Sequence, residues 1–307
     1  MIPFRAPVLE DRTWVEERFC ATGNRGCEYS FATMFLWARR YCQHVARWED
    51  FVLERLCGGQ GVGYLFPVGG TDLAGVVDAL EQDAAERGHP FRFFCVTEEQ
   101  TRQLEAACPG RFRYELDRDG FDYLYEVDKL ADLEGKKLHA KRNHINRFVQ
   151  DHPDWTVEPI TPDNLVECMT MDVEWNRRYR AREEVEQPAE DTLKDESQAL
   201  ARAFANYGPL HLRGLLLRAE GQVVAFTMGS PICKDTFDVH FEKAFGEMRG
   251  AYPLINREFA RWVREHEPGV RYLNREDDMG LPGLRKAKES YDPDLMVEKY
   301  TVLPREA

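Results

Sequence analysis

The run RGLLLRAEGQVVAFTMGSPICKDTFDVHFEKA, residues 213–244, decides the fold that the sequence predicts. Three stretches rich in apolar, β-branched and aromatic residues are separated by two short polar breaks, Glu220-Gly221 and Lys234-Asp235. Such breaks between apolar stretches are hairpin signals, and the first is the stronger because it contains glycine. The run therefore predicts three consecutive strands joined by tight turns.

The segments on either side complete an α+β unit. A strand at 155–160 and helices around 163–180 and 191–206 precede the three strands. A helix at 253–265, a strand at 270–276, a helix that opens at Pro282 and a last strand, LMVEKYTVL (295–303), follow them. Proline suits the first turn of that helix, because its missing N–H would have no partner there.

The N-terminal half shows much the same order of elements. We expect helices near 10–21 and 30–40, three strands between 44 and 69, a helix at 71–86, a strand at 91–96, a helix at 98–107, and strands at FRYEL (112–116) and YLYEV (123–127). The order β-α-α-β-β-β-α-β-α-β resembles that of the GNAT acyltransferase fold (the acyl-CoA N-acyltransferase fold), in which helices flank a mixed sheet. Its repetition indicates a tandem duplication, with two unrelated α+β domains as the alternative.

Length and composition agree with a two-domain globular protein. The chain has 307 residues, 43% of them hydrophobic and 31% charged, and single cores stop growing before this size. We expect two tandem GNAT-like domains of the α+β class, at 1–130 and 131–307. A basic connector helix at about 135–151 opens the second.

The sequence carries no sign of export or membrane insertion. The N-terminus lacks a basic segment followed by an apolar run, and the longest apolar stretch, FATMFLWA (31–38), is too short to span a bilayer. Eight scattered cysteines without a C-x-x-C pair suit reduced, mostly buried thiols in a cytoplasmic protein, and no metal site is predicted. The formal net charge of -13 argues against DNA as a partner and against adhesion to anionic membranes.

One segment departs from this acidic character. GKKLHAKRNHINRF, residues 135–148, holds five basic residues and two histidines but no acid. On a helical wheel Leu138, Ile145 and Val149 form an apolar stripe, with Lys141 and Arg142 on its flanks. Because no acidic i,i+4 partner is present to balance the like charges, the segment favours an anion site over a solvated helix face.

A second unusual stretch is YLNREDDMGLPGLRKAKESYDP, residues 272–293. Asn274 and Glu276 alternate at the end of a predicted strand, and Arg285, Lys288 and Tyr291 recur every three residues along the next helix. A carboxylate, two cations and a phenol at the end of a strand suit acyl transfer, because one group accepts a proton while others stabilise an oxyanion. The alternative is a salt-bridge network that holds the last helix.

Two further features have simpler interpretations. Asp278 is expected to cap the helix that opens at Pro282. Arg249 and Gly250 precede another predicted helix, at the position where this fold receives a pyrophosphate on backbone N–H groups. The glycine-rich signature of acetyl-CoA sites is incomplete there.

Together, GKKLHAKRNHINRF, INREFARW (255–262) and NREDDMGLPGLRKAKESYDP (274–293) resemble the phosphatidylglycerol lysyltransferase C-terminal-like family over nearly the whole chain. That family is related to the Fem-type peptidyltransferases, which also have two GNAT-like domains. Characterised members of both groups transfer an amino acid from aminoacyl-tRNA to a lipid hydroxyl or to a cell-wall precursor amine. The lipid-modifying members carry a membrane-embedded N-terminal region that has no counterpart in this sequence.

The resemblance implies two sets of site residues. A phosphate-bearing substrate would meet the substrate-binding set: Lys136, Lys137, Lys141, Arg142, Asn143, Asn146 and Asn274. The transfer site would contain the catalytic set: Glu276, Asp277, Arg285, Lys288 and Tyr291. Donor phosphates would bind at Arg249 and Gly250.

These observations support a transferase that needs no covalent intermediate, because an aminoacyl ester is already activated. In this hypothesis Arg285 and Lys288 stabilise the oxyanion, and Glu276 or Asp277 takes the acceptor's proton, with Tyr291 as an alternative. The expected donor is aminoacyl-tRNA, bound through its acceptor end. Two alternatives stay open: a CoA-dependent N-acyltransferase with acyl-CoA as donor, and a non-catalytic module that binds a phosphorylated ligand.

Overall fold

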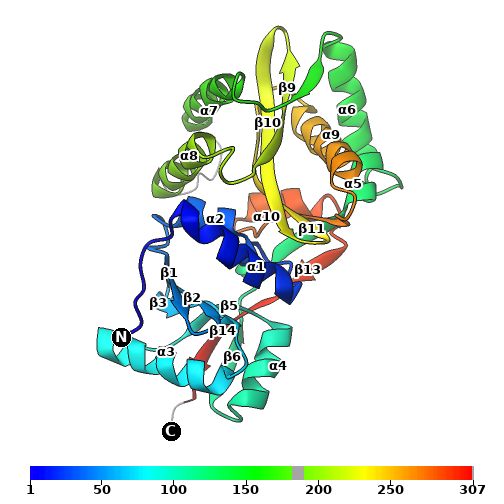
Figure 1. The fold of residues 1–307 in the computed structure, drawn as a ribbon. Coiled ribbons are helices and arrows are strands. Elements are labelled where there is room, and N and C mark those ends of the chain that lie inside the picture. Colours follow the sequence, from blue (N-terminus) through cyan, green and yellow to red (C-terminus); the bar gives the residue numbers. More distant parts are fainter. Residues whose placement is uncertain (182–189, 306–307) are drawn as a thin grey trace. The chain divides into compact units, whose positions relative to one another are not determined.

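A computed structural model describes residues 1–181 and 190–305 of the chain, and within 190–192 the backbone alone. The chain folds into two compact units, each built on a mixed sheet with helices on its faces (Figure 1). This confirms the predicted α+β class with two GNAT-like domains. Among the described residues, no helix is both long enough and apolar enough to cross a membrane.

The first unit contains Met1–Asp122, Asp277–Gly280 and Met296–Ala307. Its sheet has the order β1-β2-β3-β5-β14-β6, with β4 paired to β2. Its helices are α1 (Arg12–Thr22), α2 (Phe31–Trp37), α3 (Leu73–Arg87) and α4 (Glu98–Ala107). Its strands are β1 (His44–Trp48), β2 (Phe51–Gly58), β3 (Gly61–Tyr64), β4 (Val68–Gly69), β5 (Phe93–Thr97), β6 (Phe112–Leu116) and β14 (Lys299–Pro304).

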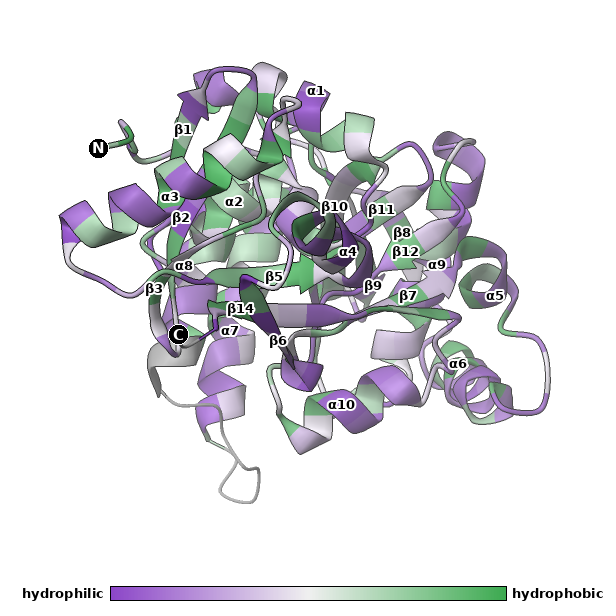
Figure 2. Cartoon of the chain, turned by 90° about the horizontal axis from the view of Figure 1, so that it is seen from below, coloured by the Kyte–Doolittle hydropathy of each residue, from purple (hydrophilic) through white to green (hydrophobic). Residues whose placement is uncertain are grey.

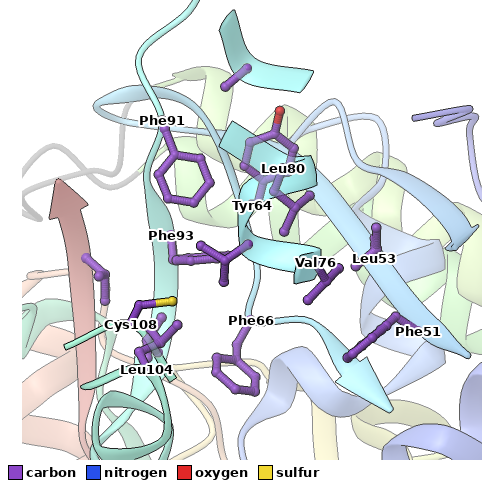
Figure 3. Close-up of a cluster of buried hydrophobic side chains, with 14 of the residues drawn as sticks. Phe51, Leu53, Tyr64, Phe66, Val76, Leu80, Phe91, Phe93, Leu104 and Cys108 are labelled. Atoms are coloured by element: carbon purple, nitrogen blue, oxygen red, sulfur yellow. The ribbon is translucent and has the colours of Figure 1, made fainter. Parts of the chain in front are cut away.

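A dense apolar core supports this first sheet. Phe93 on β5 and Phe112 on β6 are fully buried, and Leu80 on α3 and Leu104 on α4 pack into the same cluster (Figure 3). Val302 on β14 belongs to this cluster as well, although it lies near the C-terminus, far along the chain from the other four residues. The last strand therefore completes the core of the first unit.

The second unit contains Tyr123–Glu276 and Leu281–Leu295. Its sheet has the order β13-β7-β12-β11-β10-β9-β8. Its helices are α5 (Val127–Asp132), α6 (His139–Asp151), α7 (Leu165–Arg180), α8 (Glu190–Ala205), α9 (Ala251–His266) and α10 (Pro282–Glu289). Its strands are β7 (Asp122–Glu126), β8 (Thr156–Pro159), β9 (Arg213–Ala219), β10 (Gln222–Cys233), β11 (Thr236–Ala244), β12 (Tyr272–Asn274) and β13 (Leu295–Val297).

The run that decided the predicted fold forms the centre of this second sheet. Strand β10 pairs antiparallel with β9 on one side and with β11 on the other. Glu220 and Gly221, in the turn between β9 and β10, both have positive φ. Helices α7 and α8 lie on one face of these strands, whereas α9 lies on the other with α5 and α6 packed outside it (Figure 1). The hairpin prediction is confirmed.

The structure departs from the predicted boundary at residue 130 and from the predicted last strand. YLYEV pairs with β12 and so belongs to the second sheet, while LMVEKYTVL divides at Glu298 into β13 and β14. The latter strand inserts between β5 and β6 of the first sheet. Each half of the chain thus gives its last strand to the other sheet, a long-range pairing that no local pattern encodes.

Candidate functional site

The connector helix, predicted at about 135–151, forms α6 only from His139 onward, and its residues have different surroundings. Leu138, Ile145 and Phe148 are buried, whereas Lys141 and Arg142 are half-buried at the rim, as the helical wheel predicted. Gly135 and the lysine that follows it are exposed, and Figure 2 shows α6 as mainly hydrophilic. The segment is therefore an amphipathic helix on the surface of the second unit.

Several charges of this segment already have protein partners. Lys137 Nζ lies 2.7 Å from Asp292, and Arg142 donates to the carbonyl oxygens of Leu133 and, at 2.9 Å, Gly135. Arg147 Nε lies 3.4 Å from Asp151, four residues further along the helix. The prediction that the basic segment has no acidic i,i+4 partner is therefore wrong for Arg147. These contacts hold the connector in place.

The remaining polar residues of the segment point to solvent. Asn143 is exposed and contacts the ring of His139 at 3.1 Å, and Lys136 and Asn146 are exposed. Their assignment to a phosphate-bearing substrate stays a prediction.

Lys141, like Lys137, reaches from the connector to the C-terminal stretch. Its ammonium group lies 3.8 Å from the centre of the Tyr291 ring and donates to Ser290 Oγ at 2.7 Å. Arg275 lies on the same aromatic ring, with its guanidinium carbon 4.8 Å from the centre. The two segments singled out in the sequence thus meet within the second unit.

An ion pair joins Arg275 to β11. Arg275 Nη2 donates to Glu242 Oε1 at 2.7 Å, and Asn256 of α9 donates to Glu242 Oε2 at 3.0 Å. The other terminal nitrogen of Arg275, Nη1, is buried and has no hydrogen-bond partner, and the same holds for Asn256 Oδ1. We call Lys141, Glu242, Asn256, Arg275 and Tyr291 the Tyr291 cluster.

The electrostatics of the Tyr291 cluster change its proton affinities. Burial and the neighbouring Arg275 lower the pKa of Lys141 to about 8, although Glu242 acts in the opposite direction. Burial raises the pKa of the Tyr291 phenol, so it keeps its proton at neutral pH. Burial opposes the charge on Arg275 most strongly, but Glu242, Tyr125 and Tyr291 together outweigh it and the pKa of Arg275 is raised. Arg275 is therefore a permanent cation, whereas Lys141 can gain or lose a proton near pH 8.

Helix α10 carries Arg285 and Lys288. Lys288 is buried and donates to the backbone oxygen of Arg275 at 2.5 Å, and its own carbonyl accepts from Tyr125 at 2.8 Å. Arg285 is half-buried. In the structure Lys288 holds the end of β12 in place, and a direct catalytic role for Lys288 or Arg285 stays a prediction.

The three acids of the C-terminal turn have separate surroundings. Asp277 accepts from the backbone N–H of Met279 at 3.0 Å and belongs to the first unit. Asp278 accepts from Gly280 at 2.9 Å, whereas the N-cap of α10 is Leu281, so the expected helix cap is wrong. Glu276 lies beside His240, 3.5 Å from its Nδ1. Glu276 is thus the acid of the three with a defined polar environment in the second unit.

Glu276 is part of a second cluster that the sequence analysis did not foresee. Asp238 and His240 of β11 are buried, Ser230 of β10 contacts His240, and Asn274 accepts from the Glu276 N–H at 2.6 Å. The available signal was the alternation of polar residues at 238, 240 and 242 within an apolar strand. We call Ser230, Asp238, His240 and Glu276 the His240 cluster.

A β-bulge separates the two clusters. Asp238 pairs with Ser230 and Phe241 with Met228, so three steps on β11 oppose two on β10. The extra residue reverses the alternation and turns Glu242 to the face opposite Asp238. Glu242 consequently meets α9, whereas the next residue, Lys243, meets Asp172 of α7 at 2.7 Å.

Arg249 and Gly250 stand at the start of α9. Gly250 has φ 103° and is buried against α6, where a Cβ atom would lie 2.8 Å from that of Phe148. Arg249 is exposed. The glycine therefore has a packing role, and a donor-phosphate site here stays a prediction.

Comparison with known proteins identifies the family. The family described as "Phosphatidylglycerol lysyltransferase, C-terminal" matches residues 21–303. The chain belongs to this family. The name of this family refers to an aminoacyl transferase, the class of enzyme that the resemblance implied.

Two solved structures share the fold. A conserved protein of unknown function from Bacteroides thetaiotaomicron is 39% identical, with a TM-score of 0.91, over 99% of this chain and 100% of the other. The structure of L-PGS from Bacillus licheniformis has a TM-score of 0.65 at 16% identity, over 98% of this chain and 93% of the other. At that identity the likeness shows the fold alone.

One relative identified by sequence matches a smaller part of the chain than these two structures do. An uncharacterised protein of Mycoplasmoides gallisepticum is 25% identical over an alignment of 186 residues, and the match covers 59% of this chain and 55% of that protein. The match thus extends over about half of that relative.

Proposed function

We propose that this transferase moves an amino acid from aminoacyl-tRNA to a nucleophilic acceptor, and that the Tyr291 cluster carries out the transfer. The family whose name includes lysyltransferase supports the choice of an aminoacyl donor. The observation that carries the proposal is the Lys141 amine, which lies on the Tyr291 ring that Arg275 also contacts and has its pKa lowered to about 8.

A partly neutral amine suits the proton transfer that the reaction needs. The acceptor's hydroxyl or amine attacks the ester carbonyl and loses a proton, which Lys141 Nζ takes up. The carbonyl oxygen becomes negative in the tetrahedral intermediate, and Arg275 Nη1, which has no protein partner, is the donor for that charge. The ester C–O bond then breaks, and the ribose oxygen of the tRNA leaves with the proton that Lys141 took up, which returns Lys141 to its neutral form.

This proposal revises the roles suggested by the sequence. We assign stabilisation of the oxyanion to Arg275, whereas the sequence suggested Arg285 and Lys288. Lys288 is less suited to this role because it is buried and hydrogen-bonded to the backbone. Burial raises the pKa of the Tyr291 phenol, and its role as an alternative proton shuttle stays a prediction.

The test uses the full chain, tRNAs charged with labelled amino acids, and a cell lysate as the source of acceptors. We expect label to pass from tRNA into other material, at a rate that rises with pH and levels off above about pH 8. Lys141→Met should lower the rate by about 10²–10⁴-fold, the usual contribution of a general base. Lys234→Met, an exposed change in the turn after β10 and outside every assigned set, is the matched control.

Lys141→Arg separates proton transfer from simple attraction of phosphate. Arginine keeps the positive charge but does not lose its proton, so the variant should be as inactive as Lys141→Met. Full activity in Lys141→Arg would contradict the role as a base. If no charged tRNA loses label faster with protein than without it, the aminoacyl-tRNA donor is wrong. Acyl-CoA in the same assay tests the other donor.

A further inference from the structure

The His240 cluster places one imidazole between two carboxylates in the interior of the second unit. His240 Nδ1 lies 3.4 Å from Asp238 Oδ2 and 3.5 Å from Glu276 Oε1. The side chains of His240 and Asp238 are fully buried, and that of Glu276 is 22% exposed. One potential ligand atom from each of the three residues lies within 4.8 Å of the other two.

These separations suit a shared cation better than hydrogen bonds. A charge-assisted N–H···O bond measures about 2.7–2.9 Å. For ligands about 2.1 Å from a tetrahedral metal ion, neighbouring ligand atoms lie about 3.4 Å apart. The distances from His240 Nδ1 to both carboxylates match the second value. Glu276 Oε1 is a buried atom without a hydrogen-bond partner, so it is available to bind a cation.

The charges of the two carboxylates also favour a bound cation. Two carboxylates that share one buried location repel each other, and burying each charge is costly unless a positive charge compensates. A divalent cation would neutralise both. The partly exposed side chain of Glu276 provides a way in for the ion.

The surroundings of the three residues resemble the support that metal ligands receive. Ser230 Oγ lies 2.8 Å from His240 Nε2, so it can accept the Nε2 proton and leave the lone pair of Nδ1 directed at the carboxylates. The backbone of Glu276 has φ 56°, a conformation that residues other than glycine rarely adopt. The backbone N–H of Glu276 donates to Asn274 Oδ1 at 2.6 Å, which holds it in this conformation. Such local strain is typical of functional positions.

We propose that Asp238, His240 and Glu276 bind one divalent transition-metal cation. One imidazole and two carboxylates suit Zn²⁺ or Mn²⁺, with at least one position left for water or another ligand. The cluster lies on the face of the sheet opposite the Tyr291 cluster. Its occupation can therefore be measured independently of any transfer activity.

The test measures metal binding by the full-length protein. After treatment with a chelator and incubation with Zn²⁺ or Mn²⁺, desalted protein should contain about one equivalent of metal by elemental analysis, and its melting temperature should rise. Co²⁺ should give the visible absorption bands of an imidazole- and carboxylate-bound ion. Glu276→Gln and Asp238→Asn keep the side-chain shapes and should weaken binding by at least about 100-fold. Ser230→Ala should weaken it by about 10–100-fold.

Glu265→Gln, an exposed change on α9, is the matched control and should bind metal like the unaltered protein. Should the unaltered protein bind no more metal than Glu276→Gln does, the metal site does not exist. Equal binding by all variants would place the metal elsewhere on the protein. Neither result bears on transfer from aminoacyl-tRNA, because every readout here is binding.

Discussion

At the scale of single residues, the first unit buries charge and compensates for it. Lys299 is 1% exposed and lies 2.6 Å from Asp122 and 2.5 Å from Glu28. Burial opposes its charge, but Asp122 and the other acidic groups around it raise the pKa of Lys299 well above the usual range. This ion pair ties the C-terminal strand to the N-terminal part of the same unit.

Glu54, on β2 of the same unit, has no such cation and titrates differently. Burial, helped by the charge of Glu28, raises the pKa of Glu54 from 4.5 to about 8, although Gln43 donates to it at 2.7 Å. Between these two pKa values the folded state holds a proton that the unfolded state has lost. The free energy of unfolding should therefore fall as pH rises from about 5 to 8, by up to about 1.4 kcal/mol per pH unit.

Glu54→Gln tests this dependence, because glutamine imitates the protonated acid. Denaturant titrations at several pH values should show equal stability for both proteins near pH 5. Above pH 8 the variant should be the more stable. Parallel stability curves across this range would show that Glu54 does not titrate there.

At the scale of elements, close packing between α6 and α9 positions Lys141. Gly250 permits it, because its backbone has φ 103° and a Cβ atom would overlap the carbonyl oxygen of His144. Helix α6 carries both His144 and Lys141. A side chain at position 250 would therefore push away the helix that holds Lys141.

We expect Gly250→Ala to lower the free energy of unfolding by about 1–3 kcal/mol through backbone strain alone, and by more through the overlap. It should also raise the pKa of Lys141 toward its ordinary value, because the displaced amine would be better hydrated. Denaturant unfolding measures the first effect, and acetylation of Lys141 against pH, read by peptide mass spectrometry, measures the second.

Gly283→Ala is the control, since a Cβ atom there meets nothing within 4 Å. Alanine in this exposed helical position should stabilise α10 slightly, because glycine is the poorer helix former. If both glycine variants behave alike, α6 does not depend on the close approach at Gly250.

At the scale of the whole molecule, the exchange of terminal strands makes the first unit depend on the end of the chain. β14 lies between β5 and β6 and contributes Val302 to the core. A chain that ends at Glu298 would leave two strands with unpaired edges and would expose that core.

We expect this truncation to abolish the protection of β5 and β6 amides in hydrogen exchange, while β10 and β11 keep theirs. Adding a peptide of residues 299–305 should restore protection in part. Unchanged protection of β5 and β6 in the truncated chain would mean that the first unit folds without its last strand.

The predictability of the site varied with the range of the interactions. The helical period placed Lys141 at the rim of α6, and the basic segment was correctly marked as unusual. Arg275, in contrast, was not selected from the sequence, although its neighbours Asn274 and Glu276 were. Alternation along a strand shows which residues share a face, but it does not show which face lies against α6 and α9. Glu242 was missed because the bulge in β11 reverses the alternation on which the prediction relied.

The sequence by itself determined the α+β class, the repeated order of elements and the family, because periodicity, turn residues and motifs depend on near neighbours along the chain. Only the tertiary structure decided that β7 and β14 exchange sheets, that Lys141 meets Tyr291, and that His240 lies between two carboxylates. Each of these depends on segments brought together by packing of the whole unit. Their pairing is chosen by the total buried surface and hydrogen bonding, not by any local pattern.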